Sequence, residues 1–180
     1  ASRGNRRWAA LENMVIAAKE HARSLQRWET APFALEPTYN GLTKSARREL
    51  RRINQHADII GVSYYPLSQD AVHEPTVVRK HLAELFRLYP GKQVDFYQYG
   101  YPSSKRLKSS LEKQRQFVEE TFKCWDQYDK NVRLITLTWL YDVQPVHVKE
   151  MGSDTLRDIA PTEVFSEFLG SLGLHGKEAD

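Results

Sequence analysis

Short apolar runs alternate with amphipathic segments along most of the 180 residues. The apolar runs start near residues 33, 59, 94 and 132 and are rich in the β-branched and aromatic residues that strands prefer. Between them, apolar residues recur every three or four positions, which predicts helices over 7–27, 43–57, 75–89, 110–128 and from about Pro161 onward. No hairpin signal separates the runs. We therefore predict an α/β fold with a parallel sheet and right-handed crossovers.

The connections differ in length at the two ends of the predicted strands. Loops after 58–66, 94–99 and 132–142 are long and polar, whereas the loops that return to the strands are short. This asymmetry is typical of a (β/α) barrel whose site lies at the carboxyl ends of its strands. The run 33–41 is the weakest strand, because Pro37 cannot donate a ladder hydrogen bond, and we expect a turn after it at Asn40-Gly41.

One polar side chain lies at the carboxyl end of a predicted strand. The stretch Val94-Asp95-Phe96-Tyr97-Gln98-Tyr99 runs into Gly100-Tyr101-Pro102-Ser103-Ser104, which favours a strand followed by a loop. A polar residue at this position of a parallel strand often faces a ligand crevice. Buried polar groups are also commonly paired with neighbouring backbone. From the stretch alone, Gln98 fits either interpretation.

Composition excludes several classes of function. The net charge of +3 comes from Lys and Arg scattered among Asp and Glu, so we expect no nucleic-acid partner. The basic run Lys44, Arg47, Arg48, Arg51 and Arg52 fits the solvent side of a helix. No apolar run approaches the roughly 20 residues of a membrane span. The single Cys124 excludes an internal disulfide, and no histidine spacing or phosphate loop suggests a metal or cofactor.

Three segments carry a resemblance to a known family. Ile60-Gly61-Val62-Ser63-Tyr64-Tyr65-Pro66, Tyr97-Gln98-Tyr99-Gly100-Tyr101-Pro102-Ser103 and Leu137-Thr138-Trp139-Leu140-Tyr141-Asp142 resemble the sixth, seventh and eighth strands of arabinogalactanase (endo-β-1,4-galactanase)-like proteins. That family belongs to a large clan of retaining glycosidases with TIM barrels. The resemblance implies that Gln98 occupies the nucleophile position and that Trp139 floors a sugar subsite. The further expected sugar contacts are Tyr64, Tyr65, Tyr99, Tyr101 and Asn40.

The chain departs from this family at two points. The family has Glu where this sequence has Gln98, and a neutral amide is a poor nucleophile for forming a glycosyl-enzyme. The family's acid/base lies at the end of strand four, and the resemblance starts in the helix after that strand. The fold expected from it is therefore the C-terminal half of a TIM-type barrel, strands five to eight. One domain over 1–180 would consist of a leading helix and four strand–helix units, 1–28, 29–58, 59–91, 92–131 and 132–176.

Other residues could in principle replace the missing carboxylates. Glu36 precedes Pro37, short of the strand end, and Asp142 ends the predicted strand 132–142. The other candidates, Asp70, His73 and Glu74, lie in the loop after Tyr65. We interpret each of them as a loop-capping or solvated residue. Ser103 and Ser104 do not form a triad with any histidine on sequence grounds.

The sequence thus predicts a retaining glycoside-hydrolase-like barrel fragment that is inactive as this chain. An oligo- or polysaccharide is the expected ligand, and the missing barrel half or a second copy is the expected protein partner. The alternatives are a non-catalytic glycan-binding module and a protein-interaction module. Whether the Gln98 amide is natural or an engineered replacement stays open. The resemblance also implies a secreted or cell-envelope protein, although the sequence shows no signal peptide.

Overall fold

The computed structural model describes residues 3–25, 28–68, 71–148 and 162–174. Three parallel strands, β1 (Ile60–Tyr64), β2 (Val94–Tyr99) and β3 (Val132–Leu137), lie side by side in that order. The strands alternate with helices α3 (Val77–Leu88) and α4 (Leu111–Gln127), and α6 (Thr162–Leu169) follows β3. The predicted fold class, parallel (β/α) units of TIM-barrel type, is confirmed, as is the predicted order of these three strands.

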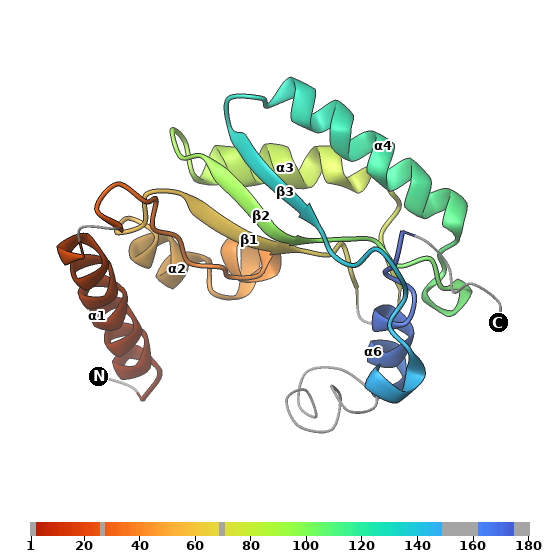
Figure 1. The fold of residues 1–180 in the computed structure, drawn as a ribbon, viewed down its shortest axis with the longest axis horizontal. Helices are drawn as coiled ribbons and strands as arrows, with labels where there is room; N and C mark the ends of the chain where they lie inside the picture. The colour runs from red at the N-terminus through yellow and green to blue at the C-terminus, as the bar shows by residue number, and fades with distance from the viewer. Residues whose placement is uncertain (1–2, 26–27, 69–70, 149–161, 175–180) are drawn as a thin grey trace.

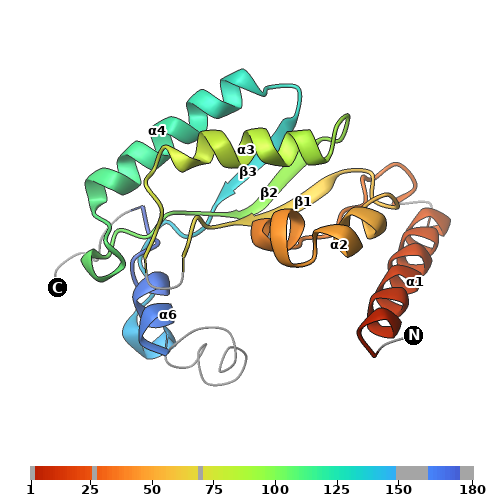
Figure 2. The same ribbon diagram turned by 180° about the vertical axis from the view of Figure 1, so that it is seen from behind.

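Helices cover one face of this sheet. Figures 1 and 2 show α3 and α4 lying along it, with α1 standing apart at one end of the molecule. The apolar stripe Val78, Leu82 and Leu85 of α3 is fully buried. Helix α4 begins at Ser110, whose hydroxyl accepts a hydrogen bond from the Lys113 N–H and so satisfies a free amide of the first turn. We call this side of the sheet the covered face, defined by Val62, Tyr64, Phe96 and Tyr99.

The first predicted strand, residues 33–41, is irregular. Residues 33–38 are extended and run parallel beside β1, where the Ser63 N–H donates to the Pro37 carbonyl over 3.1 Å and Thr38 forms a single bridge to Ser63. Pro37 has no N–H, so no continuous ladder forms there. The expected turn at Asn40-Gly41 is instead the start of a π-helix, η2 (Gly41–Ser45).

The helix predicted over 43–57 is also broken. Ala46 leaves the helical conformation between η2 and a short α2 (Arg47–Ile53). The leading helix α1 (Arg3–Ser24) is held beside this region mainly by charge. Lys19 and Arg23 each reach Asp58 over 2.6 Å, while Val15 is its one fully buried apolar residue. Such partly exposed ion pairs contribute little each to stability.

Candidate functional site

A bulge in β2 places Gln98 on the face opposite the covered one. Val94 and Phe96 are buried, and simple alternation would bury Gln98 with them. The ladder with β1 shifts by one residue after Val62, so that Ser63 pairs with Gln98 and Tyr99 turns to the covered face. Bulges of this kind re-aim side chains next to functional sites. Gln98 is accordingly exposed at the carboxyl end of its strand.

Hydrogen bonds join Gln98 to the neighbouring strand ends. The Tyr65 hydroxyl lies 3.2 Å from Gln98 Oε1 and 3.0 Å from Thr138 Oγ1. Thr138 is itself fixed, because its N–H donates to the Tyr99 carbonyl over 2.8 Å and its hydroxyl accepts from the Tyr99 N–H. Burial raises the pKa of Tyr65, opposed by its hydrogen bond to Thr138, so its phenol stays neutral and can donate one proton. Tyr65 therefore ties Gln98 to the end of β3.

Trp139 is the next residue after Thr138 and has an unusual backbone conformation. It has a φ of 69°, in the left-handed region that bulky residues rarely adopt. This conformation ends the extended chain, so β3 stops at Leu137 and the predicted continuation to 142 is wrong. The Trp139 ring is half-buried against the core, whereas Leu140 and Tyr141 are exposed. Strained backbone is typical of ligand sites, and here it lies at the same end of the sheet as Gln98.

Three of the tyrosines expected to contact sugar lie in the core instead. Tyr64, Tyr99 and Tyr101 are at most 1% exposed, so no ring face is open to a ligand. Their hydroxyls reach His81 Nδ1 at 2.9 Å, Thr121 Oγ1 at 2.8 Å and the His73 carbonyl at 2.7 Å. Phe117 of α4 stacks on the rings of Tyr99 and Tyr101, with centroids 5.2 and 4.9 Å away. The sequence expectation for these three is corrected: they hold the sheet to its helices.

The same packing shifts the titration of the buried groups. Burial raises the pKa of Tyr101 to about 12 and moves those of Tyr64 and Tyr99 further in the same direction. Burial, with the nearby His73 and Lys44, lowers the pKa of His81 to about 4. These groups are therefore neutral at physiological pH, as expected for a packed core rather than for an acid–base site.

The other residues that the sequence suggested for the site are exposed or form contacts in loops. Asn40 is exposed at the carboxyl end of 33–38, and its side chain makes no cap to η2. The Asp142 carboxylate accepts a hydrogen bond from the Gly173 N–H at 2.8 Å, and Glu74 pairs with Lys113 at 2.7 Å, which fits the loop-capping interpretation. Asp70 lies outside the described residues.

Glu36 has a position that the sequence did not suggest. The Ser63 hydroxyl donates to Glu36 Oε1 over 2.8 Å, and Ser63 is the strand partner of Gln98. We call the side of the sheet with Glu36, Ser63, Tyr97 and Gln98 the open face. Glu36 directly precedes Pro37 and Thr38, which pair with Ser63 of β1. The sequence could have placed Glu36 beside Ser63 only if the register between residues 33–38 and β1 had been known.

An ion pair between β2 and β3 lies further from the carboxyl ends of the strands than Gln98 does. The Arg133 guanidinium binds both carboxylate oxygens of Asp95, at 3.0 and 2.8 Å, and the Tyr97 hydroxyl donates to Asp95 over 3.3 Å. Asp95 is 1% exposed. The pair neutralises its own charge, so it contributes shape and rigidity to the open face rather than a free charge.

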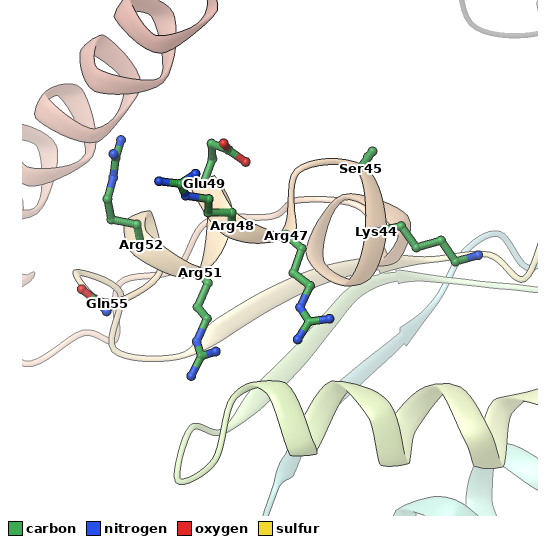
Figure 3. A pocket seen from close by; sticks show the side chains of 8 residues that line it. All are labelled: Lys44, Ser45, Arg47, Arg48, Glu49, Arg51, Arg52 and Gln55. Carbon is green, nitrogen blue, oxygen red and sulfur yellow. The ribbon is translucent and has the colours of Figure 1, made fainter.

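The basic run on η2 and α2 borders a surface hollow of about 500 Å³. Its arginines and Lys44 are exposed, as predicted. Figure 3 shows that the side chains diverge: Arg47 and Arg51 point to one side of the helix, and Glu49 and Arg52 to the other. They do not converge on a common point, so the hollow lacks the geometry of an anion site.

Metal clusters and membrane-spanning helices are both absent from the described part of the chain. Within 3–25, 28–68, 71–148 and 162–174, no group of three or more His, Cys, Asp or Glu side chains is arranged to hold a metal ion. None of the helices in those ranges is long and apolar enough to cross a bilayer.

Comparison with known proteins gives structural but not sequence relatives. No family profile matches the sequence, and no curated protein matches it. A β-1,3-glucanosyltransferase of glycoside hydrolase family 17 from Rhizomucor miehei superposes with a TM-score of 0.56 at 14% identity, over 93% of this chain and 53% of that one. An active-site mutant of the Rhizomucor miehei enzyme with laminaritriose gives 0.55 at 11% identity, over 92% and 53%. The β-glucuronidase from Ruminococcus gnavus gives 0.51 at 13%, over 88% and 26%.

The chain therefore spans about half the length of the glucanosyltransferase structures. Similarity at such low identity establishes the fold alone. The chain therefore shares the (β/α) fold of these three structures, and the more specific resemblance to arabinogalactanases stays a prediction.

Proposed function

We propose that this chain binds a β-linked glycan at the carboxyl ends of its strands and does not cleave it. The observation that carries the proposal is the place of Gln98. It lies on the open face at the end of β2, linked through Tyr65 to Thr138 and hence to Trp139. An amide, an indole and a phenol at one sheet edge supply hydrogen bonds and apolar ring surface, which together recognise sugars.

The absence of cleavage follows from the chemistry of the amide. In a retaining mechanism a carboxylate attacks the anomeric carbon and a second carboxylic acid, about 5–5.5 Å away, protonates the leaving group. We propose that Gln98 occupies the nucleophile position and that its neutral amide can neither attack nor balance an oxocarbenium charge. General acid help of this kind is typically worth 10²–10⁴-fold in rate, so efficient cleavage needs both carboxyl groups.

The first experiment separates binding from hydrolysis. The 180-residue chain is titrated with neutral β-linked gluco- and galacto-oligosaccharides and assayed for release of reducing ends. We expect binding without hydrolysis, and at least tenfold weaker binding by Trp139→Ala. Trp28→Ala is the control for loss of an indole away from the site, because Trp28 is exposed and lies just after α1. Hydrolysis by the unmodified chain would contradict the proposal.

A second experiment tests the nucleophile position. Gln98→Glu is combined with an activated aryl glycoside, whose leaving group needs little protonation, in this chain and in a full barrel that carries a strand-four Glu. We expect the full barrel with Gln98→Glu to turn over the activated glycoside. We expect this chain with Gln98→Glu to cleave no ordinary glycan. If Gln98→Glu gives no turnover of any activated substrate in the full barrel, Gln98 does not occupy the nucleophile position.

A protein partner is the second candidate function, and the open face favours it. Half a barrel leaves the inner side of its strands and two sheet edges to be covered. We propose that a second half-barrel, either another copy or a separate chain, packs there. We also propose that the protein is secreted or lies in the cell envelope, as the family resemblance implies. Sedimentation of the isolated chain is expected to show self-association or poor stability. A cooperative melt of a dilute monomer would contradict this.

A further inference from the structure

The open face has a carboxylate that neither the barrel resemblance nor the role of Gln98 explains. Glu36 is exposed in the extended segment 33–38, and Pro37 and Thr38 pair with Ser63 of β1. The backbone register therefore fixes where Glu36 lies along the sheet. Glu36 therefore lies at about the same height along the sheet as Gln98, near the carboxyl end of β2.

Side-chain contacts place Glu36 in one row with Gln98. Ser63 donates to Glu36 Oε1 at 2.8 Å, and the strand partner of Ser63 is Gln98. Neighbouring strands lie about 4.8 Å apart, so the row spans roughly 10 Å from the segment 33–38 to β2. The negative charge of Glu36 also adds to the rise in the pKa of Tyr65 and of Tyr97, in each case after burial as the main cause. Both tyrosines therefore lie within electrostatic reach of Glu36.

The charge balance of this row is negative. Glu36 is the carboxylate at the level of Gln98, whereas Asp95 is already bound by Arg133 through both oxygens. Tyr65 and Tyr97 are neutral phenols, because burial raises the pKa of each. One oxygen of Glu36 accepts from Ser63, which orients the carboxylate, and Glu36 as a whole is exposed.

From this arrangement we infer that Glu36 selects neutral sugars with free adjacent hydroxyls and rejects acidic ones. A carboxylate accepts two hydrogen bonds from a pair of sugar hydroxyls, and charge-assisted bonds of this type are the stronger ones. The Gln98 amide N–H₂ supplies the complementary donors across the row. A uronic acid would bring a second negative charge beside Glu36, on a face where the Arg133 guanidinium is already paired with Asp95. The inference rests on the proposed glycan binding and adds its specificity.

The test compares two ligands and two variants. The ligands are a neutral β-linked trisaccharide and the analogue in which one residue is a uronic acid. The variants are Glu36→Gln and, as matched control, Glu20→Gln, an exposed glutamate on α1. We expect the unmodified chain to favour the neutral ligand by about tenfold or more, and Glu36→Gln to lose about tenfold in affinity for it while the preference shrinks. Glu20→Gln should change neither value.

The outcomes separate the inference from the proposed function. Binding with an unchanged preference in Glu36→Gln, or a preference for the uronic acid in the unmodified chain, overturns the role of Glu36 and leaves glycan binding intact. Binding of neither ligand overturns both. Thermal unfolding of Glu36→Gln at the same midpoint as the unmodified chain ensures that lost affinity is not lost folding. Ser63→Ala, which frees the carboxylate from its orienting hydroxyl, should give a smaller loss than Glu36→Gln.

Discussion

The two faces of the sheet use the same residue types for opposite purposes. On the covered face, Tyr64 and Tyr99 are wholly buried and their hydroxyls are bound within the protein. On the open face, Tyr65 and Tyr97 keep part of their surface in solvent and their hydroxyls join polar side chains. The comparison shows that an aromatic residue near a strand end indicates a ligand platform only when its face of the sheet is known.

The largest difference between the faces should appear in adjacent residues of β2. Phe96→Ala removes a fully buried ring, so we expect a loss of ~3–5 kcal/mol in the free energy of unfolding. Tyr97→Ala removes a half-buried ring on the open face and should cost only about 1 kcal/mol. Urea unfolding of both variants measures the two values. Equal losses would mean that the open face is packed as a core.

The covered face should also respond to pH through His81. Its pKa is about 4 in the folded protein and 6.5 ordinarily, so the unfolded chain binds more protons between these values. Stability is therefore complete above about pH 6.5 and falls, by about 2–3 kcal/mol, as the pH drops through 4. His81→Gln should flatten the stability profile between pH 7 and 5.

Between pH 7 and 5 the titration of His81 is separated from that of the ion-paired carboxylate Glu120. Hydrogen bonds from Arg79 and Lys123 lower the pKa of Glu120 to about 2, so its contribution is lost only at more acidic pH. An unchanged slope between pH 7 and 5 in His81→Gln would show that His81 is not the group that titrates there.

A substitution at Gly61 tests how tightly the segment 33–38 packs against β1. A Cβ at this position would lie 2.3 Å from the Leu35 carbonyl oxygen and 2.8 Å from the Tyr97 ring. Gly61→Ala should therefore displace the segment 33–38 and cost ~1–3 kcal/mol in chemical unfolding. Ser63→Ala, two residues away on the same face, is the control and should cost less. If Gly61→Ala is neutral, the segment 33–38 is not held against β1.

The smallest stability effect is expected at the site itself. Tyr65→Phe removes the hydroxyl that reaches Gln98 and Thr138, a loss of about 1 kcal/mol. Its effect on glycan affinity should be larger than that on stability, because Gln98 then loses its orientation. Tyr128→Phe on the helix side is the matched control for thermal unfolding and binding. Equal effects of the two substitutions on binding would exclude a role for Tyr65 in the site.

The sequence predicted the elements better than the direction of their side chains. Residues 94–99 form β2 with the predicted bounds, because a run of valine and aromatic residues is bounded by Pro90-Gly91 and Gly100. Counting alternate residues from Phe96, however, would bury Gln98, and only the bulge between β1 and β2 places it on the open face. A bulge depends on pairing between strands, which one sequence does not display.

The same limit explains the errors in the predicted site. Tyr64 and Tyr65 are neighbours in the sequence, yet one is core and the other bonds to Gln98, because adjacent residues of a strand point to opposite faces. Glu36 lies short of its strand end in the sequence but beside Ser63 in space. The first fact follows from alternation along the chain and the second from the register between strands, and neither is visible in composition or motif.

Residue-resolved NMR during a glycan titration tests the central claim most directly. With ¹⁵N-labelled chain and a neutral β-linked oligosaccharide, we predict shifts of the Trp139 indole N–H, the Gln98 side-chain amide and the Glu36 backbone amide. The Trp125 indole, which stacks on Phe122 of α4 with ring centroids 6.0 Å apart, should stay unchanged. Saturable shifts confined to the open face would support glycan binding there. Shifts at Trp125 without shifts at Trp139 and Gln98, or no shifts at millimolar ligand, would contradict it.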